Sequence, residues 1–258
     1  MYTLGIDIGS TTSKCIILKD GAEITGSSII IAGTGTQGPQ QALDEVFRSA
    51  GISKEDIAYT VATGYGRKLF EGADGEVSEL SCHARGVHFI FPEVHTVIDI
   101  GGQDAKVLSI NDKGRMTNFL MNDKCAAGTG RFLDVMANIL QLQIGDLEVE
   151  ASKADTPVKI SNTCTVFAES EVISQLASGV AIPNLVAGIC ESVAGRVASL
   201  AKRIGIKEQV CMSGGVAQNG GVRKAMEQEL GVAIQYSEMA QLMGALGAAL
   251  YAYDKATN

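Results

Sequence analysis

The sequence of 258 residues contains no tryptophan, only four prolines and no apolar run that approaches the roughly 18 residues of a membrane-spanning helix. No low-complexity linker interrupts it. Thirty glycines between interleaved apolar segments favour an α/β protein with many tight strand-to-helix turns over an all-β protein or a disulfide scaffold. With 46% hydrophobic residues, the chain can fill the core of one large domain or of two tightly joined lobes.

Positive charge is also scarce, because 21 Lys and Arg residues are outnumbered by 29 Asp and Glu residues and the net charge is −8. The basic residues form no dense cluster, and an acidic protein repels phosphate backbones and anionic lipids. We therefore expect no nucleic-acid or membrane partner. The N-terminus has no basic segment and its apolar run is broken at Asp7, so we expect no signal peptide and a cytoplasmic location.

The six cysteines contain no Cys-x-x-Cys pair, and in a reducing compartment they need a role other than structural disulfides. Three of them lie within apolar strand or helix patterns and are expected to be buried: Cys15, Cys190 and Cys211. Cys82 is ambiguous. The three histidines, at positions 83, 88 and 95, lack the spacing of metal ligands and are expected to pack in the core or lie on the surface.

The two remaining cysteines each precede a run with helical periodicity. Cys125 is followed by a glycine-rich turn, by Thr129 as a predicted N-cap and by apolar residues at helical spacing. Cys164 stands just ahead of a second such run. The positive end of a helix dipole favours a thiolate over a thiol. Two thiols that both lie at helix starts suggest a pair with one function.

Residues 2–18 are predicted to form a strand, a turn and a strand, and the turn Gly9-Ser10-Thr11-Thr12 offers backbone N–H groups and hydroxyls that suit phosphate oxygens. Asp7 is suited to hold a hydrated Mg²⁺. Residues 97–110 repeat the pattern at a constant offset of 92, with Asp99, Gly101 and Lys106 in place of Asp7, Gly9 and Lys14. We interpret the repeat as a duplication whose two hairpins clamp a nucleotide from both sides of a shared cleft.

A third glycine turn, Ser213-Gly214-Gly215, follows a β-run and precedes a helical segment, so a flat ring or a phosphate can approach its backbone. Between the hairpins the sequence predicts a helix over 38–50, a strand over 57–63, a turn over 64–67 and a helix over 79–87. The predicted division is a first lobe of residues 1–94, onto which a C-terminal helix of residues 241–255 packs back, and a second lobe of residues 95–240.

The order of these motifs resembles the two phosphate motifs and the adenosine motif of the superfamily that contains actin, Hsp70 chaperones, hexokinase and acetate kinase. The motifs are Gly5-Ile-Asp7-Ile-Gly9-Ser-Thr-Thr, Ile98-Asp99-Ile-Gly101-Gly-Gln-Asp and Met212-Ser-Gly-Gly215. The resemblance spans essentially the whole chain. It implies the duplicated, two-lobed α/β ATPase fold of actin, Hsp70 and the acetate and sugar kinases.

Two longer segments resemble the ATP-dependent activators of 2-hydroxyacyl-CoA dehydratases, with the ATPase subunits of benzoyl-CoA reductase as relatives. They are Asn122-Asp-Lys-Cys125-Ala-Ala-Gly-Thr-Gly-Arg-Phe-Leu and Asn162-Thr-Cys164-Thr-Val-Phe-Ala-Glu-Ser-Glu171. The resemblance implies an oxygen-sensitive homodimer of amino-acid fermentation, in which Cys125 and Cys164 of each subunit bind one bridging [4Fe–4S] cluster. Two copies supply the four thiolates that such a cluster needs. ATP hydrolysis would then drive one electron from ferredoxin or flavodoxin into a partner dehydratase.

The same resemblance assigns the nucleotide site residue by residue. Asp7, Asp99 and Gln103 would handle Mg²⁺ and the attacking water. The phosphates of ATP or ADP would lie against Gly9, Ser10, Thr11, Thr12, Lys14, Gly101, Gly102 and Gln103, and the adenosine against Ser213, Gly214, Gly215 and Gln218.

Two other functions are compatible with this fold. A small-molecule kinase would need a catalytic base and a substrate pocket opposite the γ-phosphate, and the sequence shows no obvious base beyond the Asp residues already assigned to the metal. A nucleotide switch like Hsp70 or actin would leave Cys125 and Cys164 dispensable. Iron and a brown colour in anaerobically purified protein would distinguish an activator from both.

Overall fold

The computed structural model describes all 258 residues, and the chain forms two compact units. The first unit comprises Met1–Glu93, Ile110–Met116 and Gln241–Asn258, and the second comprises Val94–Ser109 and Thr117–Ala240. These units differ from the predicted lobes chiefly by Ile110–Met116, a short connection that groups with the first unit. None of the helices combines the length and the apolar character that crossing a membrane requires.

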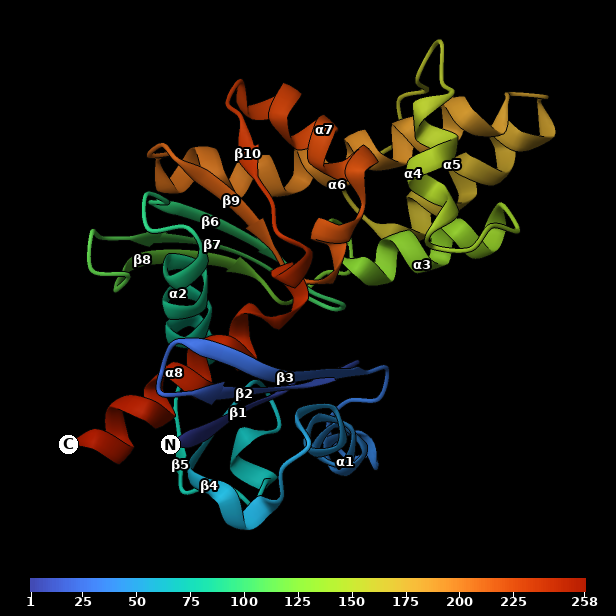
Figure 1. Ribbon diagram of the computed structural model, residues 1–258. Helices are drawn as coiled ribbons and strands as arrows, with labels where there is room; N and C mark the ends of the chain where they lie inside the picture. The colour runs from blue at the N-terminus through green and yellow to red at the C-terminus, as the bar shows by residue number, and fades with distance from the viewer. The chain divides into compact units, whose positions relative to one another are not determined.

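Each unit is built on a mixed five-stranded sheet (Figure 1). The strands of the first sheet are β1 (Tyr2–Ile8), β2 (Ser13–Lys19), β3 (Glu23–Ile30), β4 (Ile57–Thr63) and β5 (Gly75–Glu76). Those of the second sheet are β6 (Thr96–Ile100), β7 (Ala105–Ile110), β8 (Met116–Asn122), β9 (Val210–Ser213) and β10 (Ile234–Gln235).

The two sheets share one topology. Their orders are β3-β2-β1-β4-β5 and, read from the opposite edge, β8-β7-β6-β9-β10. In the first sheet β1 runs antiparallel to β2 and parallel to β4, and in the second β6 runs antiparallel to β7 and parallel to β9. Strands β1 to β5 therefore correspond to β6 to β10, as expected for a duplicated chain.

Helices follow the strands in both units. The first unit contains α1 (Gly38–Ala50), α2 (Glu79–Ile90) and α8 (Met243–Thr257), and the second contains α3 (Gly130–Ile139), α4 (Asp146–Ser152), α5 (Thr165–Ala177), α6 (Ile182–Ile204) and α7 (Gly220–Leu230). Single 3₁₀ turns occur at Lys54–Asp56, Arg67–Leu69, Gly215–Gln218 and Glu238–Leu242. The helix predicted over 38–50 and the strand predicted over 57–63 are confirmed, whereas α2 continues three residues beyond its predicted end.

The alternation of side chains along β1 decides which helix covers each face of the first sheet. Ile6 and Ile8 are buried in the core that β1 forms with α1. The opposite face carries Gly5, where a Cβ atom would lie only 2.1 Å from the Ala245 carbonyl oxygen of α8. The glycine therefore lets α8 pack directly on the strand. Asp7 points to the same face, at the carboxyl end of β1.

The core of the second unit lies between its sheet and a helical layer centred on α6. Pro183 stands in the first turn of this helix, where its missing N–H costs nothing. The core combines residues of β6, β7 and β9 with residues of α3, α6 and α7. Helices α3 and α5 both pack in this helical layer. Their packing holds the loops that precede them, which carry Cys125 and Cys164.

Candidate functional site

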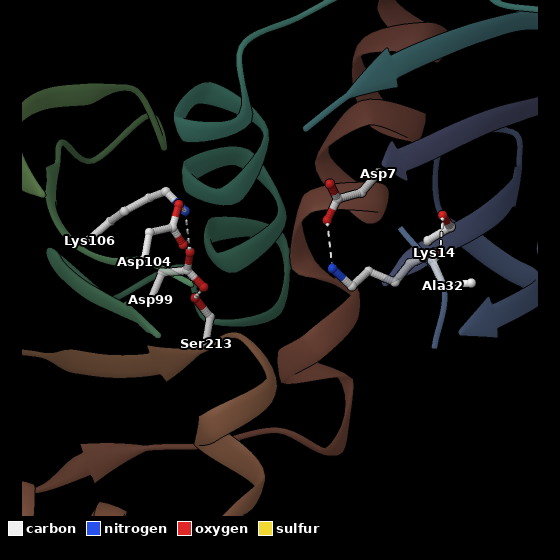
Figure 2. A network of polar contacts seen from close by, with 8 residues as sticks. Asp7, Lys14, Ala32, Asp99, Asp104, Lys106 and Ser213 are labelled. Carbon is white, nitrogen blue, oxygen red and sulfur yellow. Dashed lines mark hydrogen bonds and ion pairs between the residues drawn. The ribbon is translucent and has the colours of Figure 1, made fainter. Parts of the chain in front are cut away.

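In the first unit, the register of β1 and β2 places Asp7 opposite Lys14. The Lys14 Nζ atom lies 3.2 Å from the Asp7 Oδ2 atom (Figure 2). The turn that follows is closed by a hydrogen bond of 2.9 Å from the Gly9 N–H to the Thr12 carbonyl oxygen. The Gly9 carbonyl oxygen in turn accepts a hydrogen bond of 2.9 Å from the Thr34 N–H. A buried carboxylate therefore lies at the base of a hydrogen-bonded turn.

The second unit repeats this arrangement with additional polar contacts. Asp99 lies opposite Lys106, whose Nζ atom is 3.5 Å from Asp99 Oδ2 and 2.8 Å from Asp104 Oδ2. The Ser213 hydroxyl of β9 donates to Asp99 Oδ1 at 3.1 Å (Figure 2). The Gly101 N–H donates to the Asp104 carbonyl oxygen at 2.9 Å, as Gly9 does in the first turn. The single ammonium group of Lys106 partly compensates the charge of the two buried carboxylates.

A glycine after the neighbouring parallel strand leaves room beside each carboxylate. Gly64 follows β4 and Gly214 follows β9, and both have a φ of +83°. A Cβ atom would lie 2.5 Å from Asp7 Oδ1 at the first position and 2.7 Å from Asp99 Oδ1 at the second. The sequence pattern predicts only a turn at Gly64. The signal for its role was the recurrence of a hydroxyl residue and a glycine after a β-run, in Thr63-Gly64 and Ser213-Gly214.

The residues predicted to contact phosphates come together within their own unit. Gly9, Ser10 and Thr12 are half-buried and Thr11 is exposed, while Gly101 and Gly102 are half-buried and Gln103 is exposed. Each turn thus presents backbone N–H groups at the surface above a buried aspartate. Such concave backbone turns bind anions, and carboxylates bind hydrated Mg²⁺.

The predicted adenosine turn divides into a buried part and an exposed part. Ser213 and Gly214 are buried, and the Ser213 hydroxyl is bonded to Asp99. Gly215 is exposed and begins a 3₁₀ turn. Of these three residues, only Gly215 offers exposed backbone to the ring of an adenosine. The Ser213 hydroxyl instead orients the carboxylate of Asp99.

Gln218 lies at the end of this 3₁₀ turn within a polar cluster that sequence analysis missed. The Tyr236 hydroxyl donates to Gln218 Oε1 at 2.6 Å, and the Arg223 guanidinium lies 3.9 Å from the centroid of the Tyr236 ring. A guanidinium stacked on an aromatic ring makes a favourable cation–π contact. Because the cluster joins α7 to the segment after β10, no local sequence pattern indicates it.

Cys125 and Cys164 lie on neighbouring loops of the second unit. The Cys125 Sγ atom is 3.8 Å from the carbonyl oxygen of Thr163, the residue before Cys164. Both cysteines are partly exposed. The structure therefore brings the two predicted ligand residues close together, although α3 and α4 intervene in the chain.

Side chains inside the two cysteine motifs hold these loops. The Asn122 amide donates to the carbonyl oxygens of Cys125 (2.9 Å) and Ala127 (3.1 Å). The Glu171 carboxylate accepts a hydrogen bond of 2.8 Å from the Ser161 N–H. Asn122 and Glu171 thus shape the two cysteine loops, a role that sequence analysis did not assign to them.

The two thiols differ in their relation to the helices. Cys164 is the N-cap residue of α5, as predicted. Cys125 lies five residues before Gly130, the first residue of α3, and is therefore further from a helix start than the sequence pattern indicated. Thr129 occupies the N-cap position of α3, but its hydroxyl donates to the Ala126 carbonyl oxygen instead of capping the helix. The residues between Cys125 and the helix are folded into this local turn.

The other four cysteines are unsuited to metal binding. All are buried: Cys15, Cys82, Cys190 and Cys211. Burial raises the pKa of Cys82, Cys190 and Cys211 to about 12 and also raises the pKa of Cys15. Since the thiolate is the form that ligates metals, these side chains stay protonated and inert. The predicted burial of Cys15, Cys190 and Cys211 is confirmed.

The N-terminus of α3 is hydrogen-bonded to the second phosphate-type turn. The Gly130 N–H donates to the Gly101 carbonyl oxygen at 2.9 Å, and the Arg131 N–H donates to the Gly102 carbonyl oxygen at 2.8 Å. A Cβ atom at Gly130 would lie 3.2 Å from the Gly101 carbonyl oxygen. These contacts connect the turn directly to the helix that follows Cys125.

Comparison with known proteins identifies full-length relatives. Residues 4–252 match the model of the BadF/BadG/BcrA/BcrD ATPase family. The chain is 62% identical to the (R)-2-hydroxyglutaryl-CoA dehydratase activating ATPase of Acidaminococcus fermentans, over 99% of this chain and 98% of that protein. A solved structure of the activator of the 2-hydroxyisocaproyl-CoA dehydratase from Clostridium difficile with bound ADPNP has a TM-score of 0.97 at 56% identity, covering 100% of this chain and 96% of that one.

More distant structures share the fold alone. A ROK family glucokinase from Streptomyces griseus, in complex with glucose and AMPPNP, has a TM-score of 0.61 at 13% identity and covers 98% of this chain and 100% of that one. Together with the shared topology of the two sheets, this likeness confirms the predicted fold class, a duplicated α/β ATPase fold related to the sugar kinases.

Proposed function

Because the chain belongs to the BadF/BadG/BcrA/BcrD ATPase family, we propose that it uses ATP to deliver one electron to a 2-hydroxyacyl-CoA dehydratase. The observation that carries this proposal is the pair of partly exposed thiols, Cys125 and Cys164, in the same unit as a phosphate-type hairpin. The full-length similarity to named activators of such dehydratases supports the choice of partner.

ATP and Mg²⁺ are the ligands that suit the two hairpins. The N–H groups of the turns bind the phosphates, and the buried carboxylates of Asp7 and Asp99 bind the hydrated metal ion. Lys14 and Lys106 hold these carboxylates in place at 3.2 and 3.5 Å. Gln103 is exposed at the tip of the second turn, where an amide side chain orients the attacking water. The exposed Gly215 borders the adenosine.

Cys125 and Cys164 would hold half of a [4Fe–4S] cluster, a group that supplies reversible one-electron transfer when it is bound. The residues present fit this group, because these two thiols alone are partly exposed while burial raises the pKa of the other four. A cubane cluster needs four thiolates, and one chain contributes two. The ligand set is therefore completed by a second copy of the chain across a twofold axis.

The surface beside Cys164 supports a homodimer. Val166 and Phe167 lie in the first turn of α5, just after Thr165, and are 65% and 68% exposed. Ile173, further along α5, is also exposed. Neighbouring exposed apolar side chains are typical of interaction surfaces, and a second copy that supplies the missing thiolates would cover these.

The partner removes water from a 2-hydroxyacyl-CoA after one-electron reduction, and ferredoxin or flavodoxin supplies the electron to this protein. Within this chain, the hydrogen bonds from Gly130 and Arg131 to the second turn supply the link between nucleotide and thiol loop. A turn that rearranges when the γ-phosphate leaves would shift the start of α3 and, with it, the loop of Cys125.

The proposal predicts that reduced protein passes an electron to a cognate dehydratase only when hydrolysable ATP is present. Dithionite-reduced protein would be mixed anaerobically with the dehydratase, and its oxidation followed by visible absorbance. We expect fast oxidation with Mg²⁺-ATP and little with ADP or without nucleotide. Equal rates under all three conditions would show that ATP does not gate the electron and would contradict the proposal.

Substitution of Gly130 by valine is predicted to weaken this gating more than it weakens ATP turnover or iron content. The added side chain would push the start of α3 away from the Gly101 carbonyl oxygen, which lies 3.2 Å from the Cβ position. Gly145→Val is the matched control, because a Cβ atom there would meet nothing within 4 Å. If both variants transfer electrons with unchanged ATP dependence, the contact between α3 and the turn does not carry the coupling.

A further inference from the structure

The exposed end of the predicted adenosine turn has little rigidity of its own. Gly214 and Gly215 stand side by side at its start, and glycine restricts the backbone less than any other residue. The 3₁₀ turn that follows is closed by two hydrogen bonds, of 3.3 Å from the Ala217 N–H and of 3.0 Å from the Asn219 N–H. Hydrogen bonds in 3₁₀ turns have poorer geometry than those in α-helices. The shape of the turn therefore depends on contacts with other elements of the second unit.

Helix α7 supplies the first of these contacts. The Arg223 Nη1 atom donates to the Ala217 carbonyl oxygen at 2.5 Å. The start of α7 is fixed by its N-cap, where the Asn219 side chain accepts a hydrogen bond of 3.0 Å from the Val222 N–H. Val222 and Met226 are buried in the second core and hold the helix there. Arg223 is thus a charged donor on a fixed support, and such donors make hydrogen bonds roughly twice as strong as neutral ones.

The segment after β10 supplies the other contacts. The Tyr236 hydroxyl donates to Gln218 Oε1 at 2.6 Å, and Gln218 Nε2 donates to the Glu238 carbonyl oxygen at 3.2 Å. The Gly214 N–H donates to the Ala240 carbonyl oxygen at 2.9 Å. Both ends of the Gln218 amide are therefore bonded within the protein. Gln218, which was predicted to contact the adenosine, anchors the turn through its amide.

Arg223 and Tyr236 also support one another. The Arg223 guanidinium lies 3.9 Å from the centroid of the Tyr236 ring, a distance at which a cation and an aromatic face attract each other. The stack joins α7 to the segment after β10, the two elements that anchor the turn. The two side chains thus form one clamp, which reaches the turn at Ala217 and at Gln218.

We propose that Arg223 and Tyr236 are positioning residues for the adenosine of ATP, which hold the turn in the shape that presents the exposed backbone of Gly215. The inference rests on the proposed use of ATP and on the predicted adenosine turn. Neither side chain touches the nucleotide in this scheme, and both act through Ala217 and Gln218. A turn that is already held in shape binds its ligand without the entropic cost of ordering it.

The test compares Arg223→Met and Tyr236→Phe in the full chain. The methionine keeps an apolar stem against the ring but cannot donate to Ala217, and the phenylalanine keeps the ring but cannot donate to Gln218. We expect KM for ATP and Kd for ADP to rise about 10-fold or more in Arg223→Met and about 2- to 10-fold in Tyr236→Phe. The rate at saturating ATP should stay within about twofold of wild type, because the two acidic hairpins are unchanged.

The first unit offers a matched control for each variant. Arg85 lies 5.7 Å from the centroid of the Tyr251 ring, so Arg85→Met removes a cation–π contact away from the adenosine turn. The Tyr59 hydroxyl donates to the Asp74 carbonyl oxygen at 3.1 Å, so Tyr59→Phe removes a tyrosine hydrogen bond to the backbone. Both controls should keep KM and Kd at the wild-type values.

The division of the effect between KM and kcat separates positioning from packing. A structural role would lower the folded fraction, which reduces kcat and the melting temperature and leaves KM unchanged, and that result would overturn the inference. Wild-type KM and Kd in both variants, with ATP hydrolysis intact, would also overturn it and leave the proposed function standing. A wild-type protein that hydrolyses no ATP would instead contradict the proposed function. Raised KM and Kd with unchanged kcat and melting temperature, in these two variants and in neither control, would establish the positioning role.

Discussion

Replacing Cys164 by serine is expected to abolish iron binding in anaerobically prepared protein, and Cys125→Ser is expected to do the same. Wild-type protein should contain about four irons per dimer, because a [4Fe–4S] cluster takes two thiolates from each of two chains. Loss of either thiol removes two of the four ligands in the dimer. The measurements are iron and sulfide content, visible absorbance and molar mass in solution under anaerobic conditions.

Cys190→Ser is the matched control for this prediction. Cys190 is buried and its pKa is raised to about 12, first by desolvation and then by Glu191 and Glu148. The thiol therefore stays protonated, and its replacement should leave the iron content unchanged while it lowers stability slightly. Iron retained in the Cys164→Ser protein would contradict the ligand assignment. Loss of iron from Cys190→Ser with an intact fold would contradict the argument from burial.

Asp99→Asn is expected to lower the rate of Mg²⁺-ATP hydrolysis by about 100-fold or more while it leaves the iron content intact. The neutral amide would lose the charge that attracts the hydrated metal ion, and preorganised electrostatic groups of this kind are worth about 10² to 10³ in kcat. Asp7→Asn should act in the same direction. The two functions are separable because Asp99 lies at the base of a hairpin, whereas the cysteines lie on loops before α3 and α5.

The buried charges around Asp99 decide whether the Asp99→Asn protein keeps its fold. Removal of one partner of a buried ion pair often destabilises a protein by about 3 to 5 kcal/mol, because the other charge is left uncompensated. Lys106 retains Asp104 at 2.8 Å, so we expect the Asp99→Asn protein to fold. Steady-state ATPase rates would be measured with thermal unfolding and iron content on one preparation. Wild-type hydrolysis in both aspartate variants would place the nucleotide site elsewhere.

Local sequence patterns were sufficient for the hairpins and for the fold class. In a two-stranded antiparallel hairpin, turn length sets the register, and the side-chain period of two then decides which residues share a face. The repeat at a constant offset of 92 predicted two equivalent hairpins, and the structure has both, with Asp7 opposite Lys14 in one and Asp99 opposite Lys106 in the other. The buried cysteines and the position of Cys164 at a helix start follow from equally local periodicity.

Contacts between distant segments could not be predicted in this way. The approach of Cys125 to Thr163 depends on how α3 and α5 pack against the second core, and the link from Gly130 to Gly101 joins a helix to a turn of another element. The turn between Cys125 and α3 also depends on the Asn122 amide, which competes with the helix for the carbonyl groups of this stretch.

By itself, the sequence determined the two acidic hairpins and the duplicated α/β fold and predicted Cys125 and Cys164 as a pair, because turn length, side-chain period and the position of a thiol before a helix are local properties. Only the tertiary structure decided which side chains complete each hairpin. Ser213 reaches Asp99 because β9 runs parallel to β6, and α8 packs directly on β1 and α2 because Gly5 and Gly247 leave room for its backbone. Such contacts depend on packing distances between elements far apart in the chain, which no local spacing encodes.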